Sequence, residues 1–83
     1  MDELLLTGRS LTHAQRMVRC LERGNIRCTM TRMPDSIRGT GCGYVVRIRE
    51  RDYGAVKAQL EYCGLQIQHI YRAGADGFEE VRL

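Results

Sequence analysis

Hydrophobic positions in this 83-residue chain repeat with two periods that alternate along the sequence. A spacing of three and four residues is typical of a helix with one buried face, and strict alternation is typical of a half-buried strand. The helical pattern runs between Ser10 and Gly24 and again between Asp52 and Gly64. Four segments have a strand-like pattern: residues 3–7, 26–33, 44–49 and 65–71. The predicted order is therefore strand, helix, strand, strand, helix, strand.

The two predicted helices have recognisable ends. Ser10 or Thr12 can cap the first helix, and Gly24 is suited to the position just after its last turn. Asp52 can cap the second helix, and Gly64 ends it. The residues predicted to be buried on the two helices are Leu11, Ala14, Met17, Val18 and Leu21, and then Tyr53, Val56, Leu60 and Cys63.

The strands differ in how many of their faces are apolar. Residues 3–7 are apolar on both faces, which predicts a central strand, whereas the other three segments alternate. Their inward-facing residues are predicted to be Ile26, Cys28, Met30, Tyr44, Val46, Ile48, Leu65 and Ile67. With right-handed crossovers, this order predicts an α+β fold, a ferredoxin-like βαββαβ sandwich. Its four-stranded antiparallel sheet would have both helices on one face.

The length fits a single domain over residues 1–83. Residues 72–83 are predicted to form a C-terminal loop followed by an extra strand or an arm. The net charge of +3 is too small to indicate a nucleic-acid partner, and no apolar stretch is long enough to span a membrane. No cofactor is indicated. The acidic start after Met1 does not resemble a signal peptide, so a cytoplasmic location is expected.

Four cysteines stand at positions 20, 28, 42 and 63. Cys20, Cys28 and Cys63 fall on apolar faces of predicted elements, where cysteine behaves as a small hydrophobic residue. We therefore expect core thiols in a reducing compartment and no disulfide framework. The cysteine spacing contains no Cys-x-x-Cys pair, so no metal site is predicted. His69 is expected to be an ordinary residue of a sheet face.

The segment 34–43 is too long to be a simple connection between two strands. Long loops often carry function, and glycines at 39, 41 and 43 would let a partner approach the backbone closely. Cys42 lies between Gly41 and Gly43, so its thiol is sterically open on both sides. The loop is the predicted functional site and Cys42 its reactive residue.

The predicted topology places this loop beside the start of the first helix. Helix N-termini and cationic neighbours lower the pKa of a thiol, so Arg9 and His13 are candidate thiolate stabilisers and Arg38 lies in the loop itself. The second helix is predicted to end on the same side, which makes Cys63 a candidate resolving thiol for Cys42.

Five segments carry a family resemblance: the segment 14–21, Gly24-Asn25-Ile26, Met33-Pro34-Asp35-Ser36-Ile37, Gly41-Cys42-Gly43 leading into Tyr44-Val45-Val46, and Gln68-His69-Ile70-Tyr71. In these segments the chain resembles the selenium/sulfur carrier-like protein family of small bacterial domains. The family usually has an arginine directly after the proline, where this chain has Asp35. Two alternatives follow: Arg38 serves nearby, or anion binding there is lost. The resemblance implies that Cys42 carries sulfur or selenium as a persulfide or perselenide, supported by Pro34, Ser36, Arg38, Gly41 and Gly43.

Three functions remain open from the sequence. The first is a carrier or accessory protein, which is favoured over a turnover enzyme. It would exchange sulfur or selenium with donor and acceptor proteins. A non-catalytic regulatory or interaction domain would instead use the 34–43 loop to bind an anion or a partner, and could pair as a homodimer. RNA binding on the open sheet face is the weakest reading, because the central strands offer no exposed aromatic for base stacking.

Overall fold

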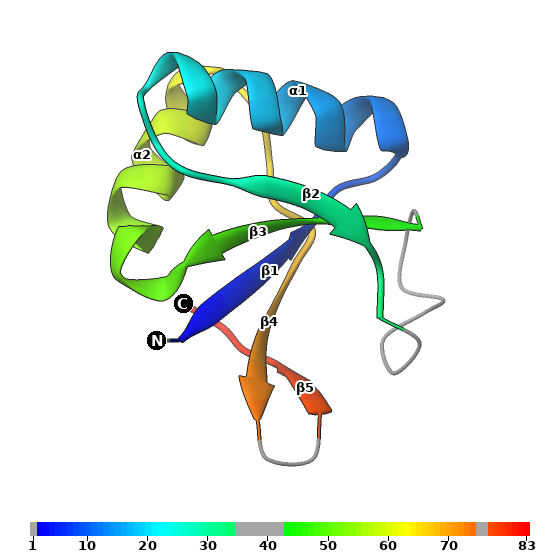
Figure 1. The fold of residues 1–83 in the computed structure, drawn as a ribbon. Coiled ribbons are helices and arrows are strands. Elements are labelled where there is room, and N and C mark those ends of the chain that lie inside the picture. Colours follow the sequence, from blue (N-terminus) through cyan, green and yellow to red (C-terminus); the bar gives the residue numbers. More distant parts are fainter. Residues whose placement is uncertain (1, 35–42, 75–76) are drawn as a thin grey trace.

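The computed structural model describes residues 2–34, 43–74 and 77–83 (Figure 1). Two helices lie over one face of a five-stranded antiparallel sheet. The elements in chain order are β1 (Glu3–Thr7), α1 (Leu11–Arg23), β2 (Thr29–Arg32), β3 (Tyr44–Arg49), the 3₁₀ turn η2 (Glu50–Asp52), α2 (Tyr53–Tyr62), β4 (His69–Gly74) and β5 (Gly77–Glu80). The α+β class and the predicted order of the first six strands and helices are confirmed.

The sheet has the strand order β2-β3-β1-β4-β5, and every neighbouring pair is antiparallel. The prediction of four strands is therefore wrong in number. The fifth strand pairs with β4 from Tyr71 opposite Glu80 to Gly74 opposite Gly77. Gly77 has a φ of 120°, a backbone conformation that glycine adopts readily, at the start of this returning strand.

The predicted bounds of β1 and β3 agree with the structure, whereas β2 is shorter than predicted and begins later. Strand β4 both begins and ends later than predicted, so residues 72–74 belong to this strand and not to the predicted C-terminal loop. Residues 26–28 and 65–68 alternate in hydrophobicity but connect helices to strands. Ile26 donates its N–H to the carbonyl of Leu21, and Leu65 donates to Leu60, so both main chains are still bound to the preceding helix. Their apolar side chains pack on the core without joining the sheet ladder. In these two segments, the alternation of apolar and polar residues indicates which side chains are buried. It does not indicate pairing with another strand.

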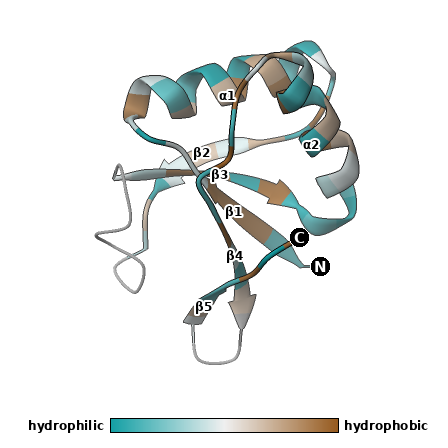
Figure 2. Cartoon of the chain, turned by 180° about the vertical axis from the view of Figure 1, so that it is seen from behind, coloured by the Kyte–Doolittle hydropathy of each residue, from teal (hydrophilic) through white to brown (hydrophobic). Residues whose placement is uncertain are grey.

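Two apolar clusters lie on opposite faces of the sheet. The larger one fills the space between the sheet and the helices, and β1 and β3 contribute hydrophobic stretches to it (Figure 2). Its buried members are Leu4, Leu6, Ala14, Met17, Cys20, Leu21, Val46, Ile48, Val56 and Leu60. The smaller cluster, on the face away from the helices, contains Leu5, Met33, Val45 and Tyr71, with Phe78 packed against it. Because β1 supplies residues to both clusters, its predicted central position is confirmed.

The ends of α1 follow the predicted capping chemistry. The Ser10 hydroxyl accepts a hydrogen bond from the His13 N–H at 3.2 Å, and Gly24 occupies the C-cap. Leu11 was predicted to be buried but is 40% exposed, because it sits in the first turn, beyond the edge of the core. Asp52 stands at the N-cap of α2 but makes no side-chain capping bond.

Candidate functional site

The ends of four elements lie close together at one end of the strands of the sheet. Because β1 and β2 both run antiparallel to β3, they run in the same direction. Three strand ends therefore lie on the same side of the molecule as the N-terminus of α1 (Figure 1). They are the end of β1 at Thr7, the end of β2 at Arg32 and the start of β3 at Tyr44. The sequence-based placement of the 34–43 segment beside the start of α1 stays a prediction, because residues 35–42 lie outside the described residues.

The two flanks of the predicted loop are fixed to each other. The Met33 N–H donates to the Gly43 carbonyl at 2.9 Å, which continues the β2–β3 ladder by one bond. Pro34 is half-buried and Gly43 is exposed. Residues 35–42 lie outside the described residues. These include the predicted site residues Ser36, Arg38, Gly41 and Cys42.

Gly43 is not required by the backbone of the described structure. Its φ lies outside the positive range that favours glycine, and a Cβ built on it would have nothing within 4 Å. The fold itself would therefore accept a side chain at this position. Within the described residues, nothing requires glycine at Gly43.

His13 and Arg9 lie together at the N-terminus of α1. The Arg9 main-chain N–H donates to His13 Nδ1 at 3.2 Å, so the neutral ring carries its proton on Nε2. Burial and the charges of Arg9 and Arg16 hold the pKa of His13 below its ordinary value. His13 is thus a neutral hydrogen-bond donor at neutral pH, and the cationic groups at this helix end are the arginines. The ring packs so closely on Gly8 that a Cβ there would lie 2.5 Å from Nδ1.

Cys20 and Cys63 form a disulfide that joins α1 to the end of α2. Their Cα atoms are 6.5 Å apart, within the normal range for a disulfide. The predicted core position is confirmed, since Cys20 belongs to the larger cluster and Cys63 packs against it, but the prediction that both are free thiols is wrong. Their sequence separation of 43 residues gave no sign of the pairing, which arises because the end of α2 packs against the last turns of α1.

The same packing changes the predicted surroundings of Cys63. It was expected near the start of α1, as a resolving thiol for Cys42. Cys20 lies nine residues after Leu11, which is roughly 13 Å along a helix that rises 1.5 Å per residue. The structure thus holds Cys63 at the far end of α1, away from the helix N-terminus. Its role as a resolving thiol stays a prediction.

Cys28 is the free cysteine among the described residues, and it is half-buried. Burial, and then the charge of Glu22, raise the pKa of its thiol. Its sulfur lies 3.9 Å from the carbonyl oxygen of Val18. Cys28 is therefore held in the protonated form, which is a poor nucleophile.

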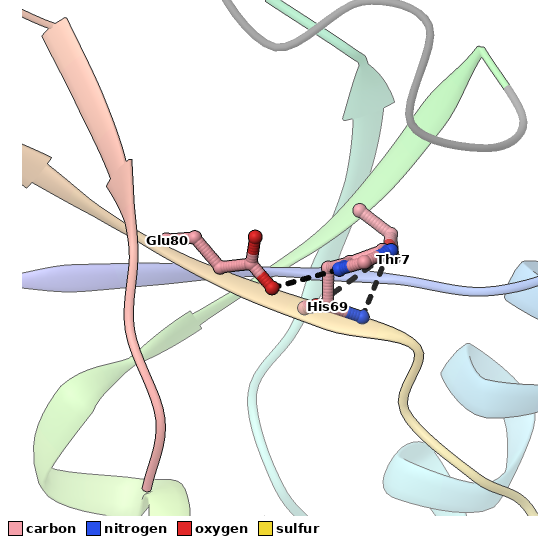
Figure 3. A network of polar contacts seen from close by, with 3 residues as sticks. All are labelled: Thr7, His69 and Glu80. Atoms are coloured by element: carbon pink, nitrogen blue, oxygen red, sulfur yellow. Dashed lines mark hydrogen bonds and ion pairs between the residues drawn. The ribbon is translucent and has the colours of Figure 1, made fainter.

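A polar network that the sequence did not reveal lies on the open face of the same sheet edge (Figure 3). The buried Thr7 hydroxyl accepts a hydrogen bond from the His69 N–H at 3.0 Å. The His69 ring nitrogen Nδ1 lies 2.8 Å from a carboxylate oxygen of Glu80 on β5. His69 was expected to be an ordinary sheet-face residue. Its partner could not be foreseen, because residues 72–83 gave no clear strand pattern.

The open face also carries a basic cavity, at the opposite end of β1. It has a volume of about 350 Å³ and is lined by Glu3, Arg27, Cys28, Thr29, Arg47, Ile48 and Arg49. Glu3 neutralises Arg47 through a direct ion pair. Tyr71, an aromatic on this face, is only 5% exposed and so offers no surface for base stacking.

The comparison with protein families finds a matching model, described as "Putative Se/S carrier protein-like", over residues 3–72. The chain belongs to this family. The match covers all four cysteines and both helices, whereas β5 lies beyond its end. Neither the curated proteins nor the solved structures include a match.

Two further findings apply to the described residues of this selenium/sulfur carrier-like domain. No helix in the described ranges is long and apolar enough to cross a membrane. Within the same ranges, no three histidine, cysteine, aspartate or glutamate side chains are grouped so that they could hold a metal ion.

Proposed function

We propose that this domain carries sulfur or selenium on Cys42 and passes it between a donor and an acceptor protein. The observation that carries the proposal is the state of the other three cysteines. Cys20 and Cys63 are bonded to each other, and the pKa of Cys28 is raised by burial. Cys42, within the family match, is then the cysteine left to supply a nucleophilic thiolate.

The transfer is redox-neutral and needs no cofactor. The Cys42 thiolate attacks the outer sulfur of a donor persulfide, a new Cys42 S–S bond forms, and the donor leaves as a thiolate. A nucleophile on the acceptor then takes the outer sulfur, and the Cys42 thiolate is released. A perselenide would follow the same course with selenium as the outer atom. In this role the domain acts as a carrier or accessory protein rather than as a turnover enzyme.

The described surroundings of the 34–43 segment support a thiolate there. The N-terminus of α1 supplies unpaired N–H groups and partial positive charge at the edge where β2 ends and β3 begins. Arg9 adds a full positive charge, while neutral His13 can donate a hydrogen bond from Nε2. Pro34 and Gly43 flank the loop, and Ser36, Arg38 and Gly41 within it are proposed to position the thiol.

We also infer that the first four strands and the two helices form a ferredoxin-like sandwich, with β5 added beside β4. The order β2-β3-β1-β4 with antiparallel neighbours supports this, as do two helices on one face. The arrangement leaves β2 and β5 as edge strands. Either could pair with a second copy of the chain in a homodimer.

Intact-mass spectrometry after incubation with a persulfide donor tests the carrier function. The parent protein should gain one sulfur atom, or one selenium atom with a selenium donor, and peptide mapping should place it on Cys42. Cys42→Ser should abolish the gain, whereas the matched control Cys28→Ser should load like the parent. If Cys42→Ser still gains the atom, the carrier proposal is wrong. Intact partner binding with no loading of the parent would instead identify an interaction domain.

A further inference from the structure

The disulfide between Cys20, a buried member of the larger core cluster, and Cys63, which packs against that cluster, also lines a cavity. The cavity has a volume of about 410 Å³ and is lined by Arg16, Arg19, Cys20, Arg23, Cys63 and Leu65. Arg16, Cys20 and Arg23 follow one another at intervals of four and three residues, so they share one face of α1. The cavity volume is in the range of small-molecule sites, about 300–1,000 Å³.

The cavity is positively charged. Arg16, Arg19 and Arg23 are all exposed. In the described part of the chain, the ion pairs join Arg47 to Glu3, Arg51 to Asp52, His69 to Glu80 and Arg72 to Glu50. The three arginines of the cavity take part in none of these described pairs. Their combined charge is therefore available to an anion that enters.

The two sulfur atoms have different surroundings. Cys63, at the end of α2, is partly exposed, whereas Cys20 is only 3% exposed. An incoming thiolate can therefore reach Cys63 more readily than Cys20. Attack on Cys63 would release Cys20 as a thiolate, flanked on its helix by Arg16 and Arg23. A leaving thiol whose anion is stabilised departs faster.

We propose that the Cys20–Cys63 pair is a redox-active disulfide whose substrate is a small thiol that carries carboxylates. In the first step the substrate thiolate attacks Cys63, the Cys20–Cys63 bond breaks, and a mixed disulfide and a Cys20 thiolate form. A second substrate thiolate attacks the substrate sulfur of the mixed disulfide. The products are the oxidised substrate disulfide and, after uptake of two protons, two thiols on the domain. The pair gains two electrons and two substrate molecules lose one each.

This site is separate from the proposed carrier cysteine. It uses the disulfide at the far end of α1, and of its three arginines only Arg16 also acts on His13 near the helix N-terminus. It also reconciles the disulfide with the expected cytoplasmic location, because cytosolic disulfides are usually transient and catalytic or redox-sensing. A purely structural disulfide would need neither the cavity nor the arginines.

Reduction by thiols of different charge tests the proposal on the folded, full-length protein. Glutathione is the anionic probe, 2-mercaptoethanol the neutral one and cysteamine the cationic one. Differential alkylation with peptide mapping measures the reduced fraction of Cys20 and Cys63 over time. Each rate is divided by the rate of the same thiol with a neutral, unstructured peptide disulfide, which removes differences in intrinsic nucleophilicity.

The normalised reduction rate with glutathione should then exceed that with 2-mercaptoethanol by about tenfold at low salt. The normalised rate with cysteamine should fall below that with 2-mercaptoethanol. The triple variant Arg16→Gln, Arg19→Gln, Arg23→Gln should lose this order, and high salt should weaken it. The matched control Arg27→Gln, Arg47→Gln, Arg49→Gln removes the same charge from the opposite face and should keep it. Cys42→Ser should also keep it, which separates this result from the carrier proposal.

Two outcomes would overturn the proposal. The first is equal normalised rates for the three probes, or the same order of rates in the triple variant. The second is a disulfide that becomes reducible only when the circular dichroism signal shows unfolding. In that case the bond is a structural link between α1 and α2.

Discussion

The Met33 N–H and the Gly43 carbonyl oxygen lie 2.9 Å apart and join the two flanks of the segment that carries Cys42. This bond involves only main-chain atoms, so it survives any side chain introduced at Gly43. No described residue occupies the space beside Gly43, and the φ angle of Gly43 is not in the positive range. A side chain introduced at Gly43 can therefore hinder the access of a partner to Cys42 without lowering the stability of the domain.

Gly43→Val should slow sulfur loading of Cys42 while costing less than about 1 kcal/mol of unfolding free energy, because no described atom is displaced. Loading rates and thermal melts measure the two effects. Val46→Ala is the contrasting variant: it removes packing from a fully buried position and should cost about 2–4 kcal/mol with loading unchanged while the domain is folded. If Gly43→Val loads as fast as the parent, Gly43 contributes only to the turn.

The four cysteines should react with an alkylating agent in a fixed order. Cys42 should be labelled first, and Cys28 should follow at least about tenfold more slowly at pH 8 because its raised pKa and burial keep it protonated. Cys20 and Cys63 should stay unlabelled until a reductant is added. A timed series with peptide mapping gives the order. Glu22→Gln should modestly accelerate Cys28 by removing the smaller cause of its raised pKa.

Early labelling of Cys28 would contradict this order. It would mean that the half-buried thiol opens to solvent faster than its surroundings in the folded domain indicate. The proposal that Cys42 is the nucleophile would then lose the observation that carries it.

The periodic segments were predictable because their burial is set locally. Strands β1 and β3 have the predicted bounds, since Leu4, Leu6, Val46 and Ile48 face the helices. Leu5 and Val45, at positions of opposite parity, face the open side. The ends of β2 and β4 were not predictable in the same way. Apolar residues such as Leu65 and Ile67 pack on the core from a connecting segment, which no local pattern distinguishes from a strand.

The parts of the candidate site that sequence reasoning missed depend on long-range contacts. The Cys20–Cys63 bond requires the end of α2 to reach the last turns of α1, and that depends on how the two helices pack in the fold rather than on residue spacing. The contact of His69 with Glu80 requires β5, a short strand with only four residues. The neighbourhood of Arg9 and His13 was foreseen because the order of elements alone brings the end of β1 to the start of α1.

Removing the disulfide should destabilise the domain by up to about 4 kcal/mol, because the bond closes a long loop and restricts the unfolded chain. The double variant Cys20→Ala, Cys63→Ala should therefore melt at a markedly lower temperature than the parent. The parent under a strong reductant should approach the same value. An equal melting temperature in all three samples would show that the bond contributes nothing to stability, whatever its reactivity.

Thr7→Val should cost about 1–2 kcal/mol, because the His69 N–H would lose its acceptor at a fully buried position. Thr7→Ser keeps the hydroxyl and should retain the bond, at the cost of one methyl group. Chemical denaturation of the three proteins gives the comparison. If Thr7→Val is as stable as Thr7→Ser, water or another group satisfies the His69 N–H and the network is not a stabilising one.

The reactivity of Cys42 should depend on the charge of Arg9 and not on a charge of His13. The pKa of His13 is lowered by burial and by Arg9 and Arg16, so His13 is neutral at pH 7. Arg9→Gln should raise the pKa of the Cys42 thiol and slow its alkylation at pH 7 by about twofold. His13→Gln should leave that rate nearly unchanged. Arg51→Gln, which removes the same charge from the opposite edge of the sheet, is the matched control.

The lowered pKa of His13 also predicts that the folded domain loses stability when the pH falls. Because the pKa of His13 is lower in the folded protein than in the unfolded chain, the unfolded chain binds more protons as the pH falls below about 6.5. The contribution of neutral His13 is therefore complete above that pH and is lost on acidification towards the folded pKa. His13→Gln should flatten this part of the stability curve, measured by denaturant unfolding between pH 5 and 8. Should the parent and His13→Gln lose stability in parallel, the protonation of His13 is not coupled to folding. A large fall in Cys42 reactivity in His13→Gln at pH 7 would show that the ring acts through its Nε2 proton.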